Sequence, residues 1–283
     1  MLNALYLIVI ILGASGQGIV KKPYTQKTNG EGVYFYNTVL SASALLFFVI
    51  TSSKPDFVWS IVPYSIAFAF AYALSSIFMV LAIAHGSLSL TSLFISYSLI
   101  VPTLFGLIFL KDPISKGFAI GLVLLVISIF LINNYNEKVK FSFKWVIFVL
   151  LSFIGNGMCT VVQKMQQIQS EGKYKNEFMI IALVIVTIVM IIFTILKECK
   201  EIKFYAKSGW HWAIICGVLN GIVNLFVMIL SGRMAVSIMF PLISAGGLVV
   251  TYIVSRFLYK EKLTKVQFVG FIFGLSAVVF LSV

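Results

Sequence analysis

The sequence predicts an all-α polytopic membrane protein with ten transmembrane helices arranged as two inverted five-helix repeats. Of the 283 residues, 60% are hydrophobic and only 11% are charged, whereas soluble domains average about 45–50% apolar and about 25% charged residues. Apolar runs of about 20 residues, the length that crosses a bilayer, fill almost the whole chain. A pattern of charged and glycine residues also recurs about half the chain length away.

Apolar runs between charged and turn residues define the expected spans. They cover residues 2–20, 33–51, 57–84, 87–110 and 114–132 in the first half, and residues 145–163, 178–196, 210–231, 235–259 and 266–283 in the second. The first run lacks the positively charged start of a signal peptide, so we expect it to remain as the first helix. Only His85-Gly86 separates the third span from the fourth, and only Gly232-Arg233-Met234 separates the eighth from the ninth, which predicts two tight hairpins.

The recurring pattern predicts that the chain contains two related halves. The residues that match between the halves are mainly charged or glycine residues near span ends: Lys111-Asp112 with Lys260-Glu261, Gly121 with Gly270, Gly13 with Gly155, and Lys22 with Lys164. A polar stretch at residues 133–138 separates the halves, so we predict repeats at 1–135 and 136–283. Because five spans is an odd number, the second repeat enters the membrane from the opposite side. Inverted repeats around a midplane site are typical of secondary transporters.

The residues that follow the fourth and ninth spans carry a further signal. Both segments have an acid, then an apolar residue and a Ser or Thr: Lys111-Asp112-Pro113-Ile114-Ser115 and Lys260-Glu261-Lys262-Leu263-Thr264. Together with the ten spans and the tight hairpins, they resemble the drug/metabolite transporter superfamily, and most of all its ten-helix EamA-type branch. The resemblance implies an exporter or exchanger of amino acids, nucleotides or their precursors, or small amines.

Charge and motifs exclude several other function classes. The net charge of +12 comes from basic clusters between the apolar runs, where lipid headgroups and the positive-inside bias place lysines. We therefore expect membrane lipids as partners and no nucleic acid. The sequence shows no nucleophile and base pair, metal-ligand spacing or phosphate-binding loop, so we expect no enzyme, no cofactor and no metal site.

The acidic residues all lie in loops or at span ends, so no carboxylate is expected at membrane depth, where buried charges usually serve ion coupling. Two interpretations remain open. The first, which we favour, is uncoupled facilitated transport or exchange. The second is coupling through Glu261, Asp112 or His85 near the surface. Arg233 is expected to be an interface or gate residue.

Uncharged polar side chains within the spans are the candidates for substrate contact. The predicted substrate-binding residues, which include two lysines at matching span ends, are Gln17, Tyr72, Ser75, Tyr97, Asn156, Asn220, Asn224, Lys22 and Lys164. The two asparagines of the eighth span are four residues apart and share one helix face. The alternatives are interhelical hydrogen bonding for the amides, close packing for the glycines beside Gln17 and Asn156, and lysines that extend to the headgroups.

These observations predict a secondary transporter in the cytoplasmic membrane, a monomer or homodimer, that moves a small polar metabolite by alternating access. An amino acid, an amine or a nucleotide-like solute would fit. The alternative is a lipid head-group flippase or an accessory membrane subunit. The orientation of the chain in the membrane stays open. The basic loops place the termini outside under the positive-inside rule, whereas the resemblance implies that both termini are cytoplasmic.

Overall fold

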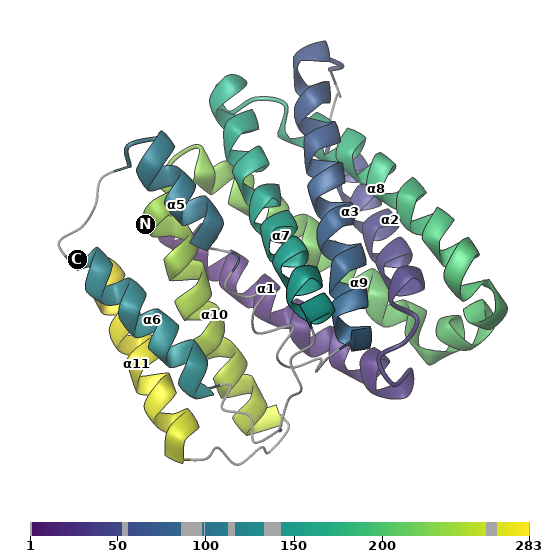
Figure 1. Ribbon diagram of the computed structural model, residues 1–283. Helices are drawn as coiled ribbons and strands as arrows, with labels where there is room; N and C mark the ends of the chain where they lie inside the picture. Colours follow the sequence, from purple (N-terminus) through teal and green to yellow (C-terminus); the bar gives the residue numbers. More distant parts are fainter. Residues whose placement is uncertain are drawn as a thin grey trace.

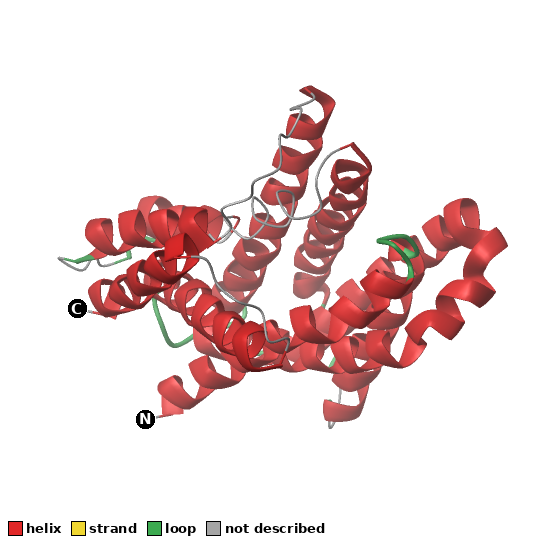
Figure 2. Cartoon of the chain, turned by 90° about the horizontal axis from the view of Figure 1, so that it is seen from below, coloured by secondary structure: helices red, strands yellow, loops and turns green. Residues whose placement is uncertain are grey.

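The computed structural model describes residues 2–52, 56–85, 98, 100–112, 117–132, 143–258 and 265–282. Within these ranges the chain forms helices joined by loops and turns, and no strand occurs (Figure 2). Two predicted site residues, Tyr97 and Glu261, lie outside the described residues, as does the side chain of Lys22. The described part of the protein is therefore all-α, as predicted.

The helices follow the expected apolar runs closely. Their bounds are α1 Leu2–Lys27, α2 Val33–Thr51, η1 Trp59–Ile61, α3 Val62–His85, α5 Ile100–Phe109, α6 Phe118–Ile132, α7 Phe143–Gln169, α8 Lys175–Glu198, η3 Cys199–Glu201, α9 Ile202–Ser231, α10 Val236–Leu258 and α11 Lys265–Ser282. Helix α2 begins and ends at the predicted residues. Helices α1 and α7 continue past the predicted limits, because the prediction stopped at polar residues that lie within the last turns of both helices.

Helix α9 begins before the predicted span, which started at Trp210. The backbone of Gly209 has a φ of 155° and interrupts the helical conformation there. A left-handed or extended-positive φ suits glycine, since it has no Cβ to clash with the backbone. The kink therefore separates a first segment with several polar residues from the apolar segment that the sequence identified.

Five helical segments of the described residues are long and apolar enough to cross a membrane, and α8 through α9 counts as one of them. Residues 100–109, 118–128 and 268–277 form shorter apolar helices. Many large apolar side chains point outward, and Ile50, Phe70 and Phe109 are at least 70% exposed. An outer surface of this kind fits contact with lipid, so the chain is a polytopic membrane protein.

The packing pairs follow a regular scheme (Figure 1). Helix α1 packs on α9 as α7 packs on α3, and α2 packs on α9 as α8 packs on α3. Helix α1 also contacts α10 as α7 contacts α5. Three further contacts pair corresponding helices of the two halves: α2 with α8, α5 with α10, and α6 with α11. Exchanging the halves in chain order turns each of these contacts into itself or into another of the set, whereas the contact of α10 with α11 lies outside the set.

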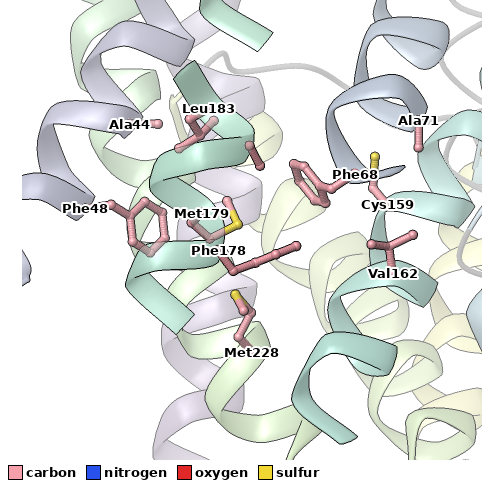
Figure 3. Close-up of a cluster of buried hydrophobic side chains, with 11 residues drawn as sticks. Ala44, Phe48, Phe68, Ala71, Cys159, Val162, Phe178, Met179, Leu183 and Met228 are labelled. Atoms are coloured by element: carbon pink, nitrogen blue, oxygen red, sulfur yellow. The ribbon is translucent and has the colours of Figure 1, made fainter. Parts of the chain in front are cut away.

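A buried apolar cluster holds α2, α3, α7, α8 and α9 together (Figure 3). Its members include Phe48 from α2, Phe68 from α3 and Phe178 from α8, and the rings of Phe68 and Phe178 meet edge to face with centroids 5.7 Å apart. Glycine permits the closest approach between α3 and α7. A Cβ on Gly155 would lie 2.7 Å from the backbone nitrogen of Ser75, so this pair of helices needs a glycine there.

The loops after α1 and after α7 have the same backbone geometry. Asn29, Gly30 and Gly32 have positive φ values in the first loop, as do Glu171, Gly172 and Tyr174 in the second. The amide of Gly30 donates to the carbonyl of Thr25 at 2.9 Å, and the amide of Gly172 donates to the carbonyl of Gln167 at 2.9 Å. Both bonds satisfy carbonyls at a helix end, as in a Schellman motif.

Candidate functional site

Four amide side chains from three helices form a hydrogen-bonded row. The Asn220 side chain donates to Oε1 of Gln17 at 3.1 Å, and the Asn224 side chain donates to Oδ1 of Asn220 at 2.9 Å. Nε2 of Gln163 then donates to Oδ1 of Asn224 at 2.7 Å. We call Gln17, Asn220, Asn224 and Gln163 the amide row. It connects α1 through α9 to α7.

The amide row contains three of the predicted substrate residues and one that the sequence did not reveal. Gln17, Asn220 and Asn224 are partly exposed, whereas Gln163 is buried. Gln163 was the last residue of a predicted span, but α7 continues beyond it to Gln169. It lies seven residues after Asn156, so both project from the same face of α7, and this spacing is a signal that could have identified it.

An amide can donate and accept hydrogen bonds at the same time, so the row suits a solute with both kinds of group. Interhelical hydrogen bonds in membranes contribute only about 0.6–2 kcal/mol each. Exchanging one of them for a bond to a solute therefore costs little. The arrangement also stabilises helix packing, which was the alternative interpretation of these residues.

Asn156 and Ser75 take part in hydrogen bonds that join α7 to other helices and segments than α9. The Asn156 side chain donates to the hydroxyl of Ser98 at 2.6 Å, and the Ser152 hydroxyl donates to the carbonyl of Ser75 at 2.8 Å. Helices α1 and α7 run without interruption through their glycines. The glycines beside Asn156 thus provide close approach to α3 and α5, and α7 is not unwound there.

Tyr72 of α3 is partly buried between two apolar clusters and stacks on Phe68 with centroids 6.2 Å apart. One of these clusters includes Cys159 of α7 and Met228 of α9. Tyr72 therefore faces α7 and α9, the helices that carry most of the amide row.

Lys21 is a second residue that the sequence did not single out. Its ammonium lies 5.7 Å from the centroid of the Tyr36 ring, and Tyr36 is 1% exposed. The Tyr36 hydroxyl has no hydrogen-bond partner of ordinary geometry, and the Cys216 thiol is a polar neighbour. Lys21 belongs to a basic pair that the sequence indicated only as a span end, whereas α1 continues to Lys27.

Lys164 and Asp112 contact the ends of neighbouring helices. The Lys164 ammonium donates to the carbonyl of Ser231, the last residue of α9, at 2.5 Å. Oδ2 of Asp112 accepts from the amide of Ser237 in the first turn of α10 at 3.1 Å. A cation at a helix C-terminus and a carboxylate at an N-terminus both complement the helix dipole, so the two side chains hold the α9–α10 hairpin.

The gate candidate Arg233 and the coupling candidate His85 lie at different ends of the bundle. The Arg233 guanidinium lies 5.5 Å from the ring of Tyr6, in the turn between α9 and α10. The exposed His85 ring contacts Phe148 with centroids 5.2 Å apart, and its Nδ1 lies 2.9 Å from the carbonyl of Leu81. Phe148 and Lys164 are near opposite ends of α7, so His85 is remote from Asp112 and Arg233.

The sequence was compared with models of known families, and the model of the EamA-like transporter family matches residues 143–283. The chain belongs to the EamA-like transporter family. This result confirms the resemblance to the drug/metabolite transporter superfamily, and the matched residues include the predicted Glu261 segment. The family that this model describes consists of membrane transporters of the drug/metabolite type.

The proteins similar to this EamA-like chain include one sequence relative and one solved structure. An uncharacterized protein of Haemophilus influenzae (strain ATCC 51907 / DSM 11121 / KW20 / Rd) is 25% identical over 185 residues, which are 64% of this chain and 62% of that protein. The similarity thus spans less than two thirds of the relative. A crystal structure of a protein, 11% identical, superposes with a TM-score of 0.77 over 98% of this chain and 95% of the other. At that identity the likeness concerns the fold alone.

Proposed function

We propose that this EamA-like protein is a secondary transporter that moves a small polar metabolite across the cytoplasmic membrane by alternating access, as an exporter or exchanger. The amide row carries the proposal. It joins α1 of the first half to α7 and α9 of the second, so it lies where the halves meet. Rocking of one half against the other changes access to a site in this position.

The proposal includes ten transmembrane helices in two inverted repeats, residues 1–135 and 136–283. Two observations support it. The pairs named above form a set that is unchanged when the halves are exchanged, and the loops after α1 and α7 share their positive φ values and helix-ending hydrogen bonds. A repeat that entered the membrane from the opposite side would produce both.

The positions of the described acids favour uncoupled transport or exchange. Asp112 accepts from the first turn of α10, and Glu198 accepts from the amides of Tyr34 and Phe35 at the start of α2. Both carboxylates stabilise helix ends. We propose Asp112, with Arg233 and Lys164, as part of a gate at the α9–α10 hairpin. Coupling through Glu261 or His85 is the competing hypothesis, which predicts that flux follows the pH gradient.

Counterflow in proteoliposomes tests the transport function. The probes are radiolabelled L-amino acids, putrescine and uridine monophosphate, each loaded inside and offered outside. Replacing two amides of the row, in Asn220→Leu with Asn224→Leu, is expected to reduce the rate for the transported probe roughly tenfold or more, because neither side chain can then hydrogen-bond the solute. Asn37→Leu is the matched control, since its side chain bonds only to the carbonyl of Val33 in its own helix.

The result also separates the proposal from its alternative. A lipid head-group flippase would move a fluorescent phospholipid between leaflets and show no counterflow of any aqueous probe. If the control variant and the double variant exchange the same probe at equal rates, the amide row is structural and the proposed site is wrong.

A cysteine that is naturally exposed tests the orientation. Cys199 in η3 is exposed, whereas Cys159 and Cys216 are buried. With the two buried cysteines replaced by serine, a membrane-impermeant maleimide labels intact cells only if η3 is external. Labelling supports cytoplasmic termini, as the family resemblance implies, and protection supports the orientation that the basic loops predict.

A further inference from the structure

Lys21 directs its charge into the helix bundle. Its ammonium lies over the ring of Tyr36, and Tyr36 belongs to a buried cluster formed by α1, α2 and α9. A lysine that extends to the lipid headgroups places its ammonium outside such a cluster. Lys27, at the end of the same helix, is exposed. These two lysines of one helix thus have different surroundings, and of the two it is Lys21 that faces the neighbouring helices.

The described acids do not balance the charge of Lys21. Among the described residues, Glu198 accepts from the α2 amides, Glu201 accepts from the Tyr205 hydroxyl at 3.0 Å, and Glu31 accepts from the same hydroxyl at 3.5 Å. A charge at membrane depth is costly without a partner, and such residues usually mark a substrate or ion pathway.

The groups around Lys21 are mainly hydrogen-bond donors. The ammonium has three N–H groups and no acceptor, and the buried Tyr36 hydroxyl has an unused O–H. The Cys216 thiol lies 3.8 Å from the carbonyl of Gln17 and donates to it. Gln17 is four residues before Lys21, on the same face of α1, so the donors adjoin the end of the amide row.

We infer that Lys21 and the Tyr36 hydroxyl bind the carboxylate of the transported solute, while the amide row binds its polar remainder. The inference rests on the proposed function and names its substrate class. A single ammonium balances one carboxylate, and a charge-assisted hydrogen bond is stronger than a neutral one. The same charge repels an amine or another cation. The solute is therefore a carboxylate-bearing metabolite, and cations without a carboxylate are excluded.

Thermal stabilisation of the purified full-length protein tests the inference with matched probes. Each pair differs in a carboxylate: L-lactate with L-lactamide, succinate with succinamide, and the L-amino acids with their amino alcohols. Putrescine, choline and uridine monophosphate complete the panel. Carboxylates are expected to raise the melting temperature of the wild-type protein, and their neutral or cationic partners are not.

Three lysine variants locate the effect. Lys21→Met is expected to weaken binding of the carboxylate by roughly ten- to a hundredfold, because a charge-assisted bond is lost. Lys21→Arg keeps the charge and is expected to retain binding. Lys27→Met removes an exposed lysine of the same helix and is the matched control. Equal melting temperatures of the variants without solute show that the folded state is retained.

The outcomes distinguish the inference from the proposed function. Carboxylate binding that depends on Lys21 supports both. If solutes bind but amino alcohols bind as well as amino acids, or if Lys21→Met binds normally, the inference is wrong and the transport function stands. If no member of the panel stabilises the protein or shows counterflow, the proposed function fails and the inference fails with it.

Discussion

The α1–α2 hairpin and the α7–α8 hairpin have the same loop backbone geometry. Their side chains at matching positions differ in chemistry. Their loops have positive φ values at corresponding residues and matching hydrogen bonds. Aligned by those loops, Lys21 of α1 corresponds to Gln163 of α7, and Gly32 corresponds to Tyr174. The backbone geometry is thus common to the two hairpins, whereas the charge of the side chain that faces the neighbouring helices differs.

The side chains that hydrogen-bond to the backbone of the two loops also differ. In the first hairpin the Tyr24 hydroxyl donates to the carbonyl of Gly32 at 2.7 Å. In the second, the Gln166 amide donates to the carbonyl of Lys173 at 3.2 Å. Different donors at matching positions satisfy a carbonyl in the loop. The comparison teaches that loop geometry restrains the backbone, while the polar side chains are free to specialise.

The largest expected effect comes from giving the second hairpin the charge of the first. Gln163 is 1% exposed and its side chain contacts Asn224 and Met179. Gln163→Lys buries an ammonium without a carboxylate, which is expected to lower the free energy of unfolding by about 3–5 kcal/mol. Denaturation in detergent, followed by circular dichroism, measures it.

Two controls accompany that exchange. Gln163→Met keeps the side-chain volume and introduces no charge, so it is expected to lower the free energy of unfolding by less than Gln163→Lys does. The reverse change, Lys21→Gln, removes an unbalanced charge and is expected to leave stability unchanged or higher. If Gln163→Lys is as stable as the wild-type protein, the two positions accept a cation equally and the contrast between the hairpins disappears.

The next largest expected effect is a loss of stability when a glycine of the first loop is replaced. Gly32 has a φ of 69°, and a Cβ there would lie 2.6 Å from the Tyr205 ring. Gly32→Ala is expected to lower the free energy of unfolding by about 2–4 kcal/mol, since it combines left-handed strain with a clash. Gly30→Ala is the control, because Gly30 has a φ of 84° but open space around its Cβ position.

For the corresponding residue of the second loop, Tyr174, we expect the opposite change in stability. Tyr174 has a φ of 57°, so Tyr174→Gly relieves local strain. A loss of stability in Tyr174→Gly as large as that in Gly32→Ala would show that side-chain contacts, and not backbone strain, decide both positions. Thermal unfolding of the purified variants distinguishes the two results.

The smallest effect concerns the start of α2. The two oxygens of Glu198 accept from the amides of Tyr34 and Phe35 at 3.0 and 2.7 Å. Glu198→Gln removes the charge and one acceptor, which is expected to cost about 1–2 kcal/mol. Faster hydrogen exchange at those two amides is the measurement. Glu171→Gln, in an exposed loop position, should leave the exchange of these amides unaltered.

The fold was largely predictable because apolar runs report which segments lie in lipid. The predicted limits of α2 coincide with the observed ones, and the predicted start at Trp210 falls just after the kink at Gly209. Polar residues misled the prediction at span ends. Lys21 and Gln163 continue their helices, since a helix needs only intact backbone bonds and extends beyond the apolar part of its sequence.

The candidate site was only partly predictable. Residue type and depth identified Gln17, Asn220 and Asn224, which the structure brings together in one row. The sequence did not indicate that Lys164 donates to the end of α9, because the rotation of one helix about its axis relative to another depends on packing. The predicted roles of Lys22, Tyr97 and Glu261 in binding or coupling stay predictions.

The amide row has a property that a row of hydroxyl or charged groups lacks. Turning an amide by half a rotation about its last side-chain bond exchanges the oxygen with the nitrogen. If Gln17, Asn220, Asn224 and Gln163 all turn, every side-chain donor becomes an acceptor and the bonds between the four side chains are kept, while the bond from Asn224 to the backbone carbonyl of Asn220 is lost. The protein can thus present either polarity to a solute at the Gln17 end, so one binding surface accommodates solutes with different hydrogen-bonding groups.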